Sequence, residues 1–227
     1  MSHFAFKTAS KLLDHALSLD YFQPDGNRKA IIPYFRVSGR DPLAVLVGDN
    51  ASGKSFARRI ITLIANQEKV EPMRVSMEDR SGGGIMNAFV YGAEQWESTG
   101  QISARTVEMG ISSAQSRERE HIIFWDEPDL GLSDDWAAGV GVAIRDFAMK
   151  PPKLTRGIFV VTHSKALVSQ LLPAKPHYVY FGDGKPPATL AQWVDRPVVP
   201  RDITTLGDIS HKRFRRIQKI LDRLKKR

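Results

Sequence analysis

The sequence predicts an α/β fold in which a mixed sheet is flanked by helices. Short, wholly apolar runs at 43–47 and 158–161 are typical of strands that are buried on both faces of a sheet. Segments of helical character alternate with such runs, and 227 residues are enough to bury a core of this kind. The lack of cysteine excludes disulfides, thiolate metal sites and a nucleophilic thiol.

The predicted elements follow one another closely along the chain. Within the second predicted helix, Phe56, Ile60, Ile61 and Ile64 recur at helical spacing. Helices are expected at 9–19, 54–67, 102–120, 135–149 and 165–172. Strands are expected at 30–37, 43–47, 73–77, 88–91, 122–125, 158–161 and 178–181.

The loop after the first buried run carries the most specific motif. It satisfies the pattern GxxxxGK[ST], with an apolar strand before it and a helix after it. Its glycines let backbone N–H groups wrap phosphates, and the helix N-terminus adds a favourable dipole. Lys54 would reach the β- and γ-phosphates, and the Ser55 hydroxyl would bind Mg²⁺. We therefore predict that ATP and Mg²⁺ are bound by Gly48, Asp49, Asn50, Ala51, Ser52, Gly53, Lys54, Ser55 and Phe56.

Two further motifs follow apolar strands. Asp126 ends the run 122–125 at the edge where α/β sheets bind ligands, so we expect it to hold the Mg²⁺ shell. Glu127 is predicted to orient and deprotonate the attacking water. His163 follows a strand that should lie beside the one carrying Asp126, so its imidazole is expected to hydrogen-bond the γ-phosphate. Lys54, Glu127 and His163 are thus the predicted catalytic residues of an ATPase.

Taken in order, GDNASGKS, FWDEP and VVTHS resemble the ATP-binding-cassette (ABC) ATPases. DEPDLGLS and THS are closer to the SMC, RecF-like and OLD-like branches than to transporter subunits, and the resemblance covers residues 43–172. It implies an ATP-dependent head-to-tail homodimer with two nucleotides held between the subunits. It also implies that Gly131, Leu132 and Ser133 belong to the loop that crosses the dimer interface.

Enzymes of this family use a signature segment to cap the γ-phosphate of the partner. The best match is Glu-Ser-Thr-Gly-Gln at 97–101, which departs from LSGGQ at its first and third positions. Ser98, Gly100 and Gln101 are therefore predicted to contact nucleotide, through a hydroxyl, a backbone N–H and a helix N-terminus. The alternative is that Ser98 is an ordinary helix cap.

Only 43 residues separate Lys54 from Ser98, too few for the helical subdomain with which transporter ATPases grip membrane partners. Gln95 is a candidate for the glutamine loop of the family, although it lies close to Ser98. The candidates for stacking on adenine are Tyr21, Phe22, Tyr34 and Phe35, and the sequence singles out none of them.

The net charge of +8 is concentrated in residues 211–227, which hold nine basic side chains and one acidic one. Phe214, Ile217, Leu221 and Leu224 form an apolar stripe at helical spacing there. Three interpretations stay open: a docked helix with a solvated basic face, nucleic-acid binding through residues 212–227, or contact with an acidic protein or membrane surface. We predict an ATPase domain at 1–210 and a basic amphipathic helix at 211–227.

The leading hypothesis is a compact cytoplasmic ABC-type ATPase in DNA maintenance or repair, genome defence or a phage process, working with an unidentified partner protein. A membrane anchor is not expected, because no apolar run approaches the ~20 residues that span a bilayer. The alternatives are the ATP-hydrolysing subunit of a membrane transporter and a nucleotide-gated interaction module.

Overall fold

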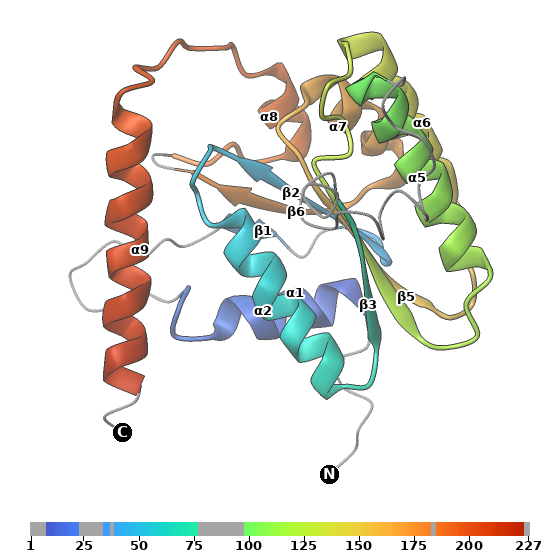
Figure 1. Ribbon diagram of the computed structural model, residues 1–227, viewed down its shortest axis with the longest axis horizontal. Coiled ribbons are helices and arrows are strands. Elements are labelled where there is room, and N and C mark those ends of the chain that lie inside the picture. Colours follow the sequence, from blue (N-terminus) through green and yellow to red (C-terminus); the bar gives the residue numbers. More distant parts are fainter. Residues whose placement is uncertain (1–7, 23–33, 37–38, 77–97, 183–184, 225–227) are drawn as a thin grey trace.

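The computed structural model describes residues 8–22, 34–36, 39–76, 98–182 and 185–224 (Figure 1). Its strands are β1 (Tyr34–Arg36), β2 (Leu43–Gly48), β3 (Glu71–Ser76), β4 (His121–Asp126), β5 (Thr155–Val161) and β6 (His177–Phe181). Its helices are α1 (Ala9–Ser18), α2 (Lys54–Gln67), α5 (Thr99–Gln115), α6 (Asp134–Met149), α7 (Lys165–Leu171), α8 (Leu190–Asp195) and α9 (Thr205–Leu224). A 3₁₀ turn at Leu172–Ala174 follows α7.

These strands form one mixed sheet in the order β1-β6-β2-β5-β4-β3. The five strands β2 to β6 are parallel, and β1 pairs antiparallel with β6 at one edge. β5 pairs with β2 on one side and with β4 on the other. The predicted α/β class is therefore confirmed, and the carboxyl ends of β2, β4 and β5 meet at one edge of the sheet.

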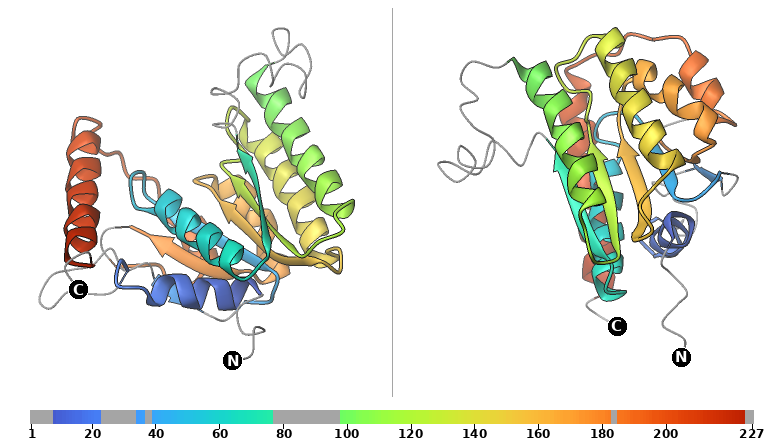
Figure 2. Two further views of the ribbon diagram at one scale, coloured as in Figure 1. Left: turned by 60° about the horizontal axis from the view of Figure 1, so that its bottom comes forward. Right: turned by 90° about the vertical axis from the view of Figure 1, so that its right-hand side faces the viewer.

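Helices cover both faces of the sheet, as Figures 1 and 2 show. Alternate strand residues point to opposite faces, so the all-apolar strands supply two cores. On one face Val45 and Val160 pack with residues of α5, α6, α7 and α8. On the other face Leu46 and Phe124 pack with α1 and α2. This three-layer arrangement holds the loops at the strand ends in fixed positions.

Most element bounds agree with the prediction to within a few residues, and α2 spans the predicted range. α5 begins earlier than expected because Ser98 and Gln101 form a capping box, in which each side chain bonds the backbone of the other. α8 was not predicted, and its N-cap is Thr189. The predicted strand 88–91 and Gln95 lie outside the described residues.

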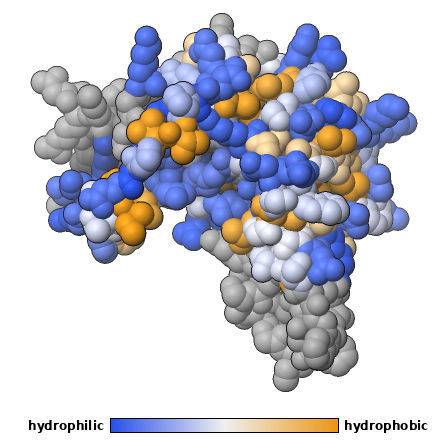
Figure 3. Space-filling view, turned by 90° about the horizontal axis from the view of Figure 1, so that it is seen from above, coloured by the Kyte–Doolittle hydropathy of each residue, from blue (hydrophilic) through white to orange (hydrophobic). Residues whose placement is uncertain are grey.

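The C-terminal helix α9 stands beside the body of the protein (Figures 1 and 2). It begins at Thr205, six residues before the predicted start at 211. Seen from above, the surface is mostly hydrophilic, with separate hydrophobic patches (Figure 3). None of the helices in the described part of the chain has the length and apolarity needed to cross a membrane.

Candidate nucleotide-binding site

The loop between β2 and α2 has a backbone that only certain residues allow. Gly48 has φ of 137°, and a Cβ there would lie 1.7 Å from the carbonyl oxygen of Phe181. Gly53, the N-cap of α2, has φ of 102°. Both glycines are therefore required by the geometry, because L side chains rarely adopt such angles. The chain turns tightly from the end of a buried strand into the first turn of a helix, as a phosphate-binding loop does.

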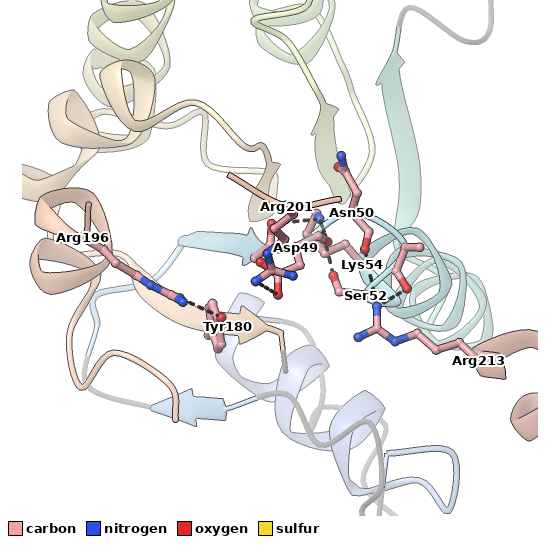
Figure 4. Close-up of polar contacts among 10 residues, drawn as sticks. Asp49, Asn50, Ser52, Lys54, Tyr180, Arg196, Arg201 and Arg213 are labelled. Atoms are coloured by element: carbon pink, nitrogen blue, oxygen red, sulfur yellow. Dashed lines mark hydrogen bonds and ion pairs between the residues drawn. The ribbon is translucent and has the colours of Figure 1, made fainter. Parts of the chain in front are cut away.

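Lys54 is buried at the start of α2 and folds back onto this loop (Figure 4). Its Nζ donates to the carbonyl oxygen of Asp49 at 2.8 Å and lies 3.4 Å from that of Gly48. Burial lowers the pKa of Lys54 to about 8, although the carboxylates of Glu127 and Asp49 oppose this shift. The ammonium group is thus held by backbone carbonyls at a site where an anionic ligand would favour its charged form.

Asp126 and Glu127 follow one another at the end of β4 but have different surroundings. The Asp126 carboxylate is buried, and its Oδ2 lies 3.0 Å from Arg58 Nε and 3.5 Å from Arg74 Nη2. Glu127 has φ of 52°, so the chain turns away from the strand direction at this residue. Its side chain is 46% exposed and faces the cavity at the phosphate-binding loop. The two arginines beside Asp126 were not predicted from the sequence.

His163 lies where β5 ends, between the ends of β2 and β4. Its Nε2 is 3.5 Å from Glu127 Oε1. Burial, followed by the positive charge of Lys54, lowers the pKa of His163 to about 4. The imidazole is therefore neutral near pH 7.

A second interaction fixes the same edge of the sheet. Thr162 Oγ1 donates to Asp129 Oδ1 at 2.6 Å and joins the loops that follow β5 and β4. Burial raises the pKa of Asp129, and the hydrogen bond from Thr162 opposes that shift. This hydrogen bond therefore links the loop that carries Glu127 to the loop that carries His163.

One cavity of about 290 Å³ joins the predicted motifs. It is lined by the loop residues 50–55, by Glu127, Val161 and His163, and by Ser210, Arg213, Phe214 and Ile217 of α9. Arg213 Nη1 donates to the carbonyl oxygen of Ala51 and lies 3.5 Å from that of Asn50 (Figure 4). The basic character of α9 is evident from the sequence, but the position of Arg213 beside the loop was not predicted, because charge alone gives no position.

The predicted signature segment lies elsewhere on the surface. Ser98, Gly100 and Gln101 line a separate cavity of about 300 Å³ with Gly131, Leu132, Ser133 and Trp136. A Cβ on Gly100 would lie 3.0 Å from the carbonyl oxygen of Gly131, so the start of α5 packs closely on that loop. Ser98 is a helix cap, as the alternative interpretation held. The structure brings the signature segment together with 131–133, and this cavity shares no lining residue with the one at the phosphate-binding loop.

Phe56 and two of the candidate aromatics belong to the core beside α1. The ring centroid of Phe56 is 5.4 Å from that of Tyr21 and 5.7 Å from that of Phe22. Phe22 is buried. These contacts place the three rings in the packing between α1 and α2.

The parallel strand order and the loop between β2 and α2 together define a P-loop NTPase fold. No protein-family model and no curated protein matches the chain. Among solved structures the chain is similar to Cdc6p from Pyrobaculum aerophilum, with 13% sequence identity and a TM-score of 0.38. The similarity covers 75% of this chain and 43% of that one, so the chain spans less than half of that protein's length. The finer resemblance to ABC ATPases stays a prediction.

Proposed function

We propose that this chain binds ATP with Mg²⁺ and hydrolyses it. One observation carries the proposal: a single cavity is lined by the phosphate-binding loop, by Glu127 and by His163. Backbone N–H groups and Lys54 would hold the β- and γ-phosphates. Glu127, whose carboxylate faces the cavity, would orient the attacking water and accept its proton.

Ser55 and Asp126 fit a magnesium ion by the chemistry of their oxygens. Ser55 is exposed in the first turn of α2, and Asp126 is the last residue of β4. Magnesium commonly keeps several waters and takes one or two carboxylates together with substrate phosphates. When bound, it would neutralise charge on the phosphates. The Asp126 carboxylate would then contact both the hydrated magnesium ion and the side chains of Arg58 and Arg74.

His163 would act as a neutral group in this site. Because the pKa of His163 is lowered to about 4, its ring would donate a hydrogen bond to a γ-phosphate oxygen without adding charge. The ring lies beside Glu127, with Nε2 3.5 Å from Glu127 Oε1.

The test compares Glu127→Gln with Glu118→Gln, a matched control on an exposed glutamate outside the cavity. We expect Glu127→Gln to bind ATP normally but to lose turnover by about 10²-fold or more, because the general base is removed. Steady-state ATPase rates and equilibrium ATP binding are the measurements. Unchanged turnover in Glu127→Gln would contradict the assignment, and loss of turnover in Glu118→Gln would show a nonspecific effect.

The ATP-dependent homodimer is a further part of the proposal, favoured by the second cavity. Ser98 and Gly100 lie beside Gly131 and Ser133, and the neighbouring Trp136 is 70% exposed. A large exposed aromatic beside backbone N–H groups at a helix start suits contact with a partner and its nucleotide. A nucleotide-gated interaction module that turns over slowly is the alternative, and the Glu127→Gln comparison separates the two.

A further inference from the structure

The basic helix α9 touches the phosphate-binding loop at consecutive residues. Arg213 approaches the carbonyl oxygens of Asn50 and Ala51. Arg201, in the segment that leads into α9, has its Nη2 3.1 Å from Asp49 Oδ2 (Figure 4). Two arginines of the C-terminal segment therefore meet the loop that the proposed function assigns to nucleotide phosphates.

α9 also supplies one wall of the cavity at that loop. Arg213, Phe214 and Ile217 line it from the helix side, while Lys54 and Glu127 line it from the body. A ligand in this cavity would therefore meet both the body and the helix. The helix side would present a guanidinium group to the ligand.

Two cations face the same small space. Lys54 and Arg213 both line the cavity of about 290 Å³, so two like charges lie close together there and repel each other. A polyanion between them would attract both cations and offset their repulsion. Hydrogen bonds from a guanidinium to phosphate are charge-assisted and stronger than its bonds to neutral carbonyls. Arg213 would therefore leave the loop carbonyls and bind phosphate oxygens when a nucleotide is present.

A larger cavity of about 450 Å³ adjoins the same loop. It runs from Gly48 and Asn50 to Trp193 of α8 and to Leu206 and Ile209 of α9, and these last three residues supply apolar surface. Both cavities are lined by Asn50 and His163. Ligand sites in proteins are commonly of this size and have mostly apolar linings with a few polar groups. This cavity thus has room for a nucleoside beside the loop that would hold the phosphates.

We propose that Arg213 binds the phosphates of a nucleoside triphosphate held by its own chain, so that α9 caps the nucleotide. The inference rests on the proposed function and extends it, because it assigns the basic helix to the nucleotide.

The test compares Arg213→Gln with Arg215→Gln in the full-length chain. Arg215 is exposed on the same helix and bonds the carbonyl oxygen of His211, so its substitution makes the same change of charge away from the loop. Equilibrium binding of fluorescent ATP and ADP analogues, at fixed salt, is the measurement. We expect Arg213→Gln to weaken ATP binding about tenfold and ADP binding less, because ADP offers one phosphate fewer to Arg213. Arg215→Gln should bind both like the unaltered protein.

Three results would overturn the inference. ATP binding by Arg213→Gln equal to that of the unaltered chain would show that Arg213 contacts no phosphate. Tighter binding would show that it competes with the nucleotide. Equal weakening in Arg215→Gln would show a general effect of tail charge. Absence of ATP binding by the unaltered, folded chain would instead contradict the proposed function itself.

Discussion

The two edges of the sheet are built from different interactions. At the carboxyl edge, Gly48 and Glu127 have positive φ, and buried Lys54 and half-buried His163 have lowered pKa values. At the amino edge, polar groups have partners that hold strand ends together. These pairs are Asp41 with Ser10 and His177, His121 with Thr155, Glu71 with Arg117, and Glu120 with Arg156.

This difference indicates a division between function and stability. The carboxyl edge keeps charged groups in positions that burial makes unfavourable, as functional sites commonly do. At the amino edge, buried His121 is bonded through both ring nitrogens, to Arg119 and to Thr155. Substitutions at the two edges should therefore separate ligand binding from folding.

The largest effect is expected from Lys54→Ala at the carboxyl edge. Because this side chain is the buried cation of the loop, we expect ATP affinity to fall about 100-fold or more. The thermal midpoint should change little, since the lost ammonium group is buried at some cost. Lys153→Ala, on an exposed lysine, is the control. A large loss of stability without loss of binding would break the proposed division.

An intermediate effect is expected from Trp136→Ala, which alters the second cavity at the carboxyl edge. If the chain forms an ATP-dependent dimer there, loss of this exposed ring should weaken dimerisation about tenfold in the Glu127→Gln background. Sedimentation velocity with and without ATP is the measurement, and Leu63→Ala on exposed α2 surface is the control. A dimer that Trp136→Ala leaves unaltered would place the interface elsewhere.

The smallest effect is expected from Asp41→Asn at the amino edge. Burial raises the pKa of Asp41, but hydrogen bonds from His177 and Ser10 lower it more, from 3.8 to about 2. The charged form therefore stabilises the fold above pH 3.8, and this contribution is lost as the pH falls towards 2. Because the side chain is 38% exposed, solvent screening reduces the contribution to about 1 kcal/mol.

Urea unfolding as a function of pH checks this prediction. Asp41→Asn should be less stable than the unaltered chain at pH 7, and the two should converge near pH 2. ATP affinity should be the same in both proteins. A change in ATP affinity would mean that the two edges are coupled.

The sequence was sufficient for those parts of the site that depend on local patterns. Gly53 and Lys54 open a helix after a buried strand, and this context can be predicted from periodicity and the glycine spacing alone. The neighbouring positions of β4 and β5 were likewise predicted, and the sheet confirms them.

Contacts between segments that lie far apart along the chain were not predicted from the sequence. Arg58 and Arg74 surround Asp126, yet each is one basic residue among many along the chain. Arg213 meets Ala51 only because the segment after α8 carries α9 back to the loop. No periodic pattern encodes the path of such a segment, so these side chains can be assigned only from coordinates.

The central position of β5 has a consequence for the way this protein can change during evolution. Its residues are in register with Leu43–Leu46 of β2 and with Ile123–Asp126 of β4 at the same time. Inserting or deleting one residue within β5 would turn its side chains to the opposite faces and shift His163 relative to both neighbouring loops. Length variation among relatives should therefore avoid 155–163 and accumulate in exposed surface connections.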